Sequence, residues 1–183
     1  MRLFVAVDVP EALKERIETD VVGRLRPSLP AARWTRPEGR HLTLKFLGRV
    51  EDDGVAGVRE AVRSVAGRHR AFRAAFSEVG GFPSLRRTRV LWVGVGEGAA
   101  PMAALASDLE RGLEPLGLEP ERRPFRGHLT LARFRSPTVV GELAGVRVPA
   151  EDFEVTELVL FESRLHPQGA RYAAVERFPL EDA

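Results

Sequence analysis

The feature that most constrains this chain is a four-residue pattern that occurs twice. His41-Leu42-Thr43-Leu44 returns 87 residues later as His128-Leu129-Thr130-Leu131. Each copy opens an apolar run whose alternation is typical of a β-strand. Because successive side chains of a strand point to opposite faces, the histidine and threonine of each copy share one face and the leucines share the other. The sequence therefore predicts two matching strands, each presenting an imidazole and a hydroxyl together.

The same spacing indicates an internal duplication, because Val90 follows Leu3 by 87 residues as His128 follows His41. The order strand, helix, motif strand, helix also recurs. We interpret residues 1–183 as a single bilobed α+β domain in which each lobe supplies one His-x-Thr strand to a shared cleft.

Periodicity and helix or turn signals predict the remaining elements. We expect helices after Pro10, Asp52 or Asp53, and Pro101, and a short helix from Ser136 to about Leu143. Lys45 shares its strand parity with His41, and Gly80, Gly81 and Pro83 read as a turn. The other strands are expected at residues 1–9, 71–79, 89–95, 153–162 and 171–178.

Composition narrows the class of protein. With 183 residues, 44% hydrophobic and 30% charged, the chain has enough apolar content for a full core. The absence of cysteine excludes disulfides and thiolate metal sites. A net charge of +2 does not by itself indicate nucleic acid binding. Since no apolar run is long enough to span a bilayer, we expect a cytoplasmic monomer without a membrane contact.

Two histidines and two threonines on strands that face a shared cleft suit phosphodiester chemistry. One imidazole acts as a base and the other as an acid, while the hydroxyls donate to non-bridging phosphate oxygens. A metal site needs three or more ligands, which this pattern does not provide, so we expect none. Residues 94–99 (Gly-Val-Gly-Glu-Gly-Ala) match a dinucleotide fingerprint formally. The next strand carries the second motif in place of the acid that holds a ribose, which favours a simple strand-to-helix loop.

The two motifs resemble the signature of the RNA 2′,3′-cyclic phosphodiesterases, also called LigT-like proteins or 2′-5′ RNA ligases, in the two-histidine phosphoesterase superfamily. The resemblance extends over segments 1–6, 33–38, 81–83, 89–95 and 162–164, with Gly169 and Tyr172. It implies a bilobed fold of two pseudo-symmetric antiparallel sheets with flanking helices around a central cleft. It also implies that RNA ending in a 2′,3′-cyclic phosphate, or a related nucleotide, is hydrolysed to a 2′-phosphate without a cofactor.

The resemblance also implies roles for single residues. His41 is the proton donor, His128 the proton acceptor, and Thr43, Thr130 and Arg133 contact the phosphate. Strand parity points Arg133 away from the histidine face unless the strand bulges. Phe125 and Tyr172 are candidates for stacking a base, with the apolar core as the alternative. Two other functions stay open: 2′-5′ ligation as the reverse reaction, and a weakly catalytic RNA- or nucleotide-binding module.

Overall fold

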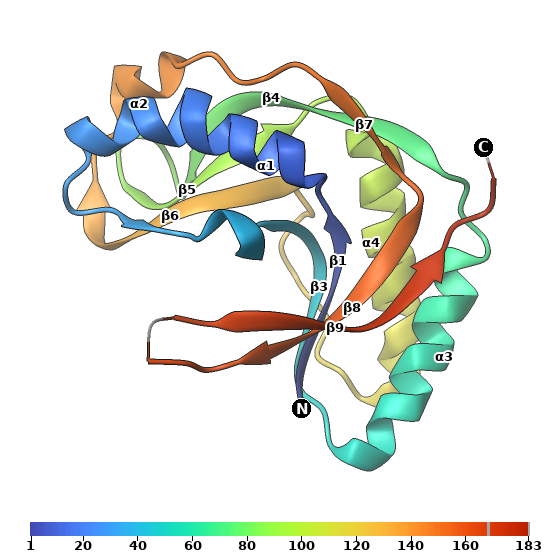
Figure 1. The fold of residues 1–183 in the computed structure, drawn as a ribbon. Coiled ribbons are helices and arrows are strands. Elements are labelled where there is room, and N and C mark those ends of the chain that lie inside the picture. The colour runs from blue at the N-terminus through green and yellow to red at the C-terminus, as the bar shows by residue number, and fades with distance from the viewer. Residues whose placement is uncertain (168, 183) are drawn as a thin grey trace.

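The computed structural model describes residues 1–167 and 169–182, which form a curled antiparallel sheet with helices packed behind it (Figure 1). The strands are β1 Arg2–Asp8, β2 Arg33–Trp34, β3 His41–Arg49, β4 Phe72–Phe82, β5 Thr88–Val95, β6 His128–Thr138, β7 Asp152–Val155, β8 Glu157–Arg164 and β9 Arg171–Pro179. The main helices are α1 Glu11–Ile17, the π-helical turn Glu18–Val22, α2 Gly23–Leu25, α3 Val55–Ala66 and α4 Ala99–Leu113.

The sheet consists of two halves of matching strand order. The order across the sheet is β7-β4-β5-β6-β3-β1-β8-β9, with β2 added to β6, and the two halves meet where β3 lies beside β6. A single residue pair, Leu42 with Leu129, joins these two strands. The predicted α+β fold with two antiparallel sheets is confirmed, with the refinement that hydrogen bonding makes the two sheets continuous.

Helices cover the outer faces of both halves. Figure 1 shows α1 and α2 lying across β4, β5 and β6, whereas α3 and α4 lie behind the half that contains β1, β3 and β8. Leu3, Val5 and Val7 of β1 face this main core. Phe4 and Ala6 of the same strand point to the opposite face and pack in a separate small cluster with β8. No described helix combines the length and apolar character needed to cross a membrane.

Several predicted boundaries are wrong for identifiable reasons. The short helix expected from Ser136 is absent because β6 continues to Thr138, which pairs with Thr88, and a 3-10 turn follows at Gly141–Gly145. Gly80 and Gly81 lie within β4, where the ring of Trp92 fills the space above Gly80. The strand expected at 153–162 is two strands, β7 and β8, that pair with different partners.

Candidate active site

The pairing of Leu42 with Leu129 brings the two motifs together. Both leucines are fully buried in the core, so the motif histidines and threonines point to the opposite, concave face. Extending this antiparallel register by one residue places His41 beside Thr130 and Thr43 beside His128. Each histidine therefore neighbours the threonine of the other copy, and the two motifs form one site.

An aromatic cluster surrounds His41. Its ring stacks on Phe4 with a centroid distance of 4.6 Å, lies 5.7 Å from Phe161, and meets Tyr172 edge-on at 4.9 Å. Burial lowers the pKa of His41 to about 4, opposed by a hydrogen bond to the backbone of Gly39 and by the negative charge of Asp8. The unliganded site therefore holds His41 neutral at pH 7.

His128 occupies the matching position in the other half. Its Nδ1 lies 2.7 Å from the carbonyl oxygen of Arg126, and the rings of Phe82 and Trp92 pack beside it. Because a carbonyl oxygen only accepts, Nδ1 carries the proton and Nε2 keeps a free lone pair. Burial lowers the pKa of His128, and the positive charges of Arg133 and Arg126 lower it further.

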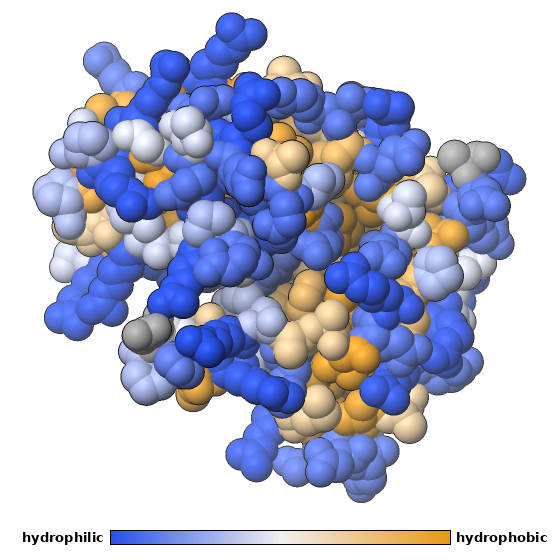
Figure 2. Space-filling view, in the orientation of Figure 1, coloured by the Kyte–Doolittle hydropathy of each residue, from blue (hydrophilic) through white to orange (hydrophobic). Residues whose placement is uncertain are grey.

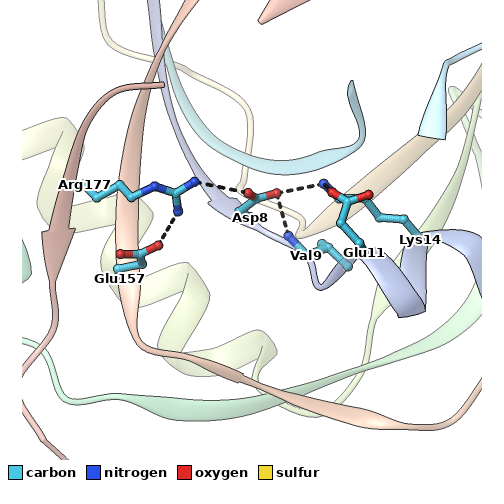
Figure 3. A network of polar contacts seen from close by, with 6 residues as sticks. All are labelled: Asp8, Val9, Glu11, Lys14, Glu157 and Arg177. Carbon is cyan, nitrogen blue, oxygen red and sulfur yellow. Dashed lines mark hydrogen bonds and ion pairs between the residues drawn. The ribbon is translucent and has the colours of Figure 1, made fainter. Parts of the chain in front are cut away.

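The ion network around Asp8 lies next to His41, because Asp8 on β1 pairs directly with His41 on β3 (Figure 3). One carboxylate oxygen accepts from the Val9 amide at 2.9 Å and from the buried Lys14 ammonium at 3.0 Å. The other oxygen lies 3.8 Å from the Arg177 guanidinium. Lys14 and Arg177 thereby hold the Asp8 carboxylate in place beside His41.

Both motif strands contain a bulge just after the threonine. The pairing shifts register between Thr43 and Lys45 on β3 and between Thr130 and Ala132 on β6. Each bulge reverses the alternation, so Phe46 and Arg133 become exposed on the same face as the histidines. Strand parity allowed Arg133 to reach the histidine face only if β6 bulges, and β6 does bulge. Arg133 has no ion pair with any described residue.

Lys45 lies on the opposite face from the one predicted. It is buried, and its ammonium donates to Glu110 of α4 at 2.8 Å and to the Glu119 carbonyl at 2.6 Å. The sequence alternation placed Lys45 beside His41 because it did not include the bulge. Lys45 therefore anchors β3 to the helix layer.

A buried polar connection links the start of β3 to the bulge of β6. The Arg40 guanidinium, fully buried, donates to the Thr35 hydroxyl at 3.1 Å and to the Glu18 carboxylate at 2.6 Å. The Thr35 hydroxyl lies 2.8 Å from the Thr130 carbonyl and 3.0 Å from the Leu131 carbonyl. Arg40 and Thr35 thus join the two motifs through backbone atoms, a role that the sequence analysis missed.

The two aromatic residues considered for base stacking, Phe125 and Tyr172, lie in different surroundings. Phe125 packs against the main core, whereas Tyr172 lies on the concave face, 40% exposed. Phe46, which the sequence analysis did not select, is 67% exposed beside Phe4. Among the described residues, no three histidine, cysteine or acidic side chains gather as a metal site would require.

The surface of the molecule is hollowed between two parts of the fold (Figure 2). In Figure 1 the β8–β9 hairpin projects beside the start of β3, and β2 and β6 lie above it in the view. Figure 2 shows a hollow between these two parts, with mainly hydrophilic residues around its visible rim. The motif side chains His41, Thr43, His128 and Thr130 are only partly buried, so a solute can reach them.

The chain is similar to known proteins over nearly its whole length. Residues 9–167 match the model of the 2′-5′ RNA ligase superfamily. An RNA 2′,3′-cyclic phosphodiesterase of Methanothermobacter thermautotrophicus is 32% identical, over 98% of this chain and 99% of that protein. A Thermus thermophilus crystal structure superposes with a TM-score of 0.82 and 28% identity, covering 100% of this chain and 99% of that one. Escherichia coli LigT complexed with 3′-AMP gives 0.75 and 27%, covering 98% and 97%.

Proposed function

The chain belongs to the 2′-5′ RNA ligase superfamily, and we propose that it hydrolyses RNA 2′,3′-cyclic phosphate ends to 2′-phosphate ends without a metal. The resemblance found in the sequence is thus confirmed at the level of the family. The observation that carries the proposal is the convergence of His41, Thr43, His128 and Thr130 on one face around the Leu42–Leu129 pair.

In the proposed reaction His128 takes a proton from water through Nε2, and the water oxygen forms a bond to phosphorus. The bond from phosphorus to the 3′ oxygen breaks, and His41 donates a proton to that oxygen as it leaves. The Thr43 and Thr130 hydroxyls and the Arg133 guanidinium donate to the non-bridging oxygens, where negative charge increases in the transition state. Proton exchange with solvent then restores both imidazoles.

The surrounding charges support this direction of proton transfer. Asp8 favours the protonated form of His41, and Arg126 and Arg133 favour the neutral form of His128. Burial keeps the unliganded His41 neutral, so the acid must gain its proton when the anionic phosphate enters and raises its pKa. In this proposal, binding of the substrate phosphate favours protonation of His41, which can then act as the acid.

The experiment uses an oligoribonucleotide with a 2′,3′-cyclic phosphate end, incubated with the chain in excess EDTA. We expect conversion to a 2′-phosphate end, identified by chromatography. A 3′-phosphate would overturn the assignment of His41 as the group that protonates the 3′ oxygen. An intact ring in EDTA that opens when divalent metal is restored would overturn metal independence.

Two alternatives are separated by related assays. Ligation uses the same groups in reverse, and supplying a 5′-hydroxyl RNA beside the cyclic end would reveal a 2′-5′ linkage. A binding module would retain RNA affinity without turnover. If His128→Ala hydrolyses the cyclic phosphate as fast as the unaltered chain does, the acid–base proposal is wrong.

A further inference from the structure

Two arginines lie directly opposite each other where β2 joins β6. Arg33 of β2 is the register partner of Arg133, and Trp34 is the partner of Ala132. Opposed residues of an antiparallel pair project to the same face, with Cβ atoms about 4.5–5.5 Å apart. Ala132 is fully buried in the main core, and Trp34 packs against the same core. The two arginines therefore project to the other, concave face, which also carries the motif histidines.

This pair of like charges has no carboxylate to neutralise it. Both side chains are exposed, and neither forms an ion pair with another residue in the part of the chain that the structure describes. Two other arginine pairs lie directly opposite each other in the described sheet, and in each a carboxylate pairs with one member: Glu51 with Arg49, opposite Arg2, at 3.3 Å, and Glu162 with Arg164, opposite Arg171, at 2.7 Å. Like charges that face each other across a strand pair are destabilising. A bound anion would relieve this repulsion between Arg33 and Arg133.

The two arginines adjoin the second motif. Arg133 follows Thr130 along β6, just beyond the bulge. Its positive charge lowers the pKa of His128, so its guanidinium is within electrostatic reach of the histidine. Arg33 lies beside Arg133 on the neighbouring strand. An anion bound by Arg33 would therefore adjoin a phosphate held between the two motifs.

We propose that Arg33 binds the phosphodiester group that links the terminal nucleotide to the rest of the RNA, beside the cyclic phosphate that Arg133 contacts. The inference rests on the proposed function, because it needs the cyclic phosphate to lie between the two motifs. A guanidinium suits this group, since its planar fork can donate two hydrogen bonds to one phosphate. Neighbouring phosphates of an RNA strand are separated by a single nucleotide, so two adjacent arginines can each meet one. The chain thereby distinguishes an RNA end from a free cyclic mononucleotide.

The test compares two dinucleotides that end in a 2′,3′-cyclic phosphate and differ only in the charge of the internal linkage. One linkage is a phosphodiester and the other a neutral methylphosphonate, and the 5′ nucleoside is 2′-deoxyadenosine in both. Arg33→Gln should lower kcat/KM for the phosphodiester substrate about ten-fold to a hundred-fold, the loss typical of a hydrogen bond to a charged group, and should leave the methylphosphonate substrate unchanged. Because this substitution removes a like-charge contact, the variant should fold as the unaltered chain does.

Arg24→Gln is the matched control, because it removes the same charge from an exposed position on α2. It should lower kcat/KM for neither substrate. An equal loss on both substrates in Arg33→Gln, or no loss on the phosphodiester substrate, would overturn the subsite.

A binding measurement separates this inference from the hydrolytic function. Calorimetry with the same two dinucleotides carrying a 2′-phosphate end needs no turnover. Arg33→Gln should raise Kd about ten-fold to a hundred-fold for the phosphodiester dinucleotide only. It should also reduce the slope of log K against log salt concentration by about 0.7, the change for one phosphate contact on a single strand. Discrimination in binding without hydrolysis would support the subsite and contradict the proposed function, whereas hydrolysis without discrimination would overturn the subsite alone.

Discussion

At the scale of single residues, the two histidines are chemically alike in sequence and different in structure. Both are held by backbone carbonyl groups and packed against rings. The charge of Asp8 raises the pKa of His41 and the charge of Lys14 opposes it, whereas the charges of Arg133 and Arg126 both lower the pKa of His128. This difference supports opposite roles in proton transfer, which the symmetric sequence pattern leaves undecided.

The pKa of His41 should be low in the free protein and should rise when an anion binds. Because an adjacent negative charge favours the imidazolium, inorganic phosphate should raise the pKa from about 4. NMR titration of the ring resonances with and without phosphate measures this shift. His69 lies outside the site, paired with Asp108, and the positions of its ring resonances serve as the control for effects of phosphate away from the site. A His41 pKa that phosphate leaves unchanged would contradict the account.

At the scale of elements, the sequence predicted the motif strands, the amphipathic helices and the shared face of His41, Thr43, His128 and Thr130. Alternation and the four-residue apolar spacing are local signals, and they were sufficient for these features. The bulges depend on pairing with β1 and β5, which lie distant in sequence, so the faces of Lys45 and Phe46 were beyond local reasoning. The Arg40–Thr35 connection depends on tertiary contacts in the same way.

The bulge of β6 gives a testable link between Thr35 and Arg133. Thr35→Val removes the hydroxyl that bonds the Thr130 and Leu131 carbonyls, whereas Thr35→Ser retains it. Arg133→Gln should lower kcat/KM about ten-fold to a hundred-fold, since a hydrogen bond to a charged group contributes about 1.5–3 kcal/mol. This loss should be smaller in the Thr35→Val background and unchanged in the Thr35→Ser background. If the losses in kcat/KM of Thr35→Val and Arg133→Gln simply add in the double variant, Thr35 does not position Arg133.

Lys45 should contribute to stability and not to phosphate binding. Lys45→Met removes the ammonium that donates to Glu110 and to the Glu119 carbonyl and leaves Glu110 with the Glu121 amide alone, which should lower the free energy of unfolding by about 1–3 kcal/mol. Urea denaturation measures this change, with the exposed Arg24→Met as the control. A raised KM with unaltered stability would contradict this role and would indicate that Lys45 contacts the phosphate.

At the scale of the whole molecule, each half of the sheet depends on distant parts of the chain. β1 and β3 are completed by β8 and β9 from the C-terminal end, and β6 from the second copy closes the site beside β3. The two histidines therefore come together only when the complete sheet forms. The two halves share a strand order but carry different residues at equivalent positions, which supports the proposed acid and base roles at the two ends of the site.

The most direct test of these opposed roles replaces the 3′ oxygen of the cyclic phosphate by sulfur. A thiolate leaves without protonation, because a thiol such as that of cysteine has a pKa near 8.5, far below that of a ribose hydroxyl. On the oxygen substrate, His41→Ala and His128→Ala should each lose about 10²- to 10⁴-fold in rate. On the sulfur substrate the rate of His41→Ala should recover toward that of the unaltered chain, and the rate of His128→Ala should not. Recovery of His128→Ala alone would reverse the two roles, and recovery of neither would contradict leaving-group protonation by either histidine.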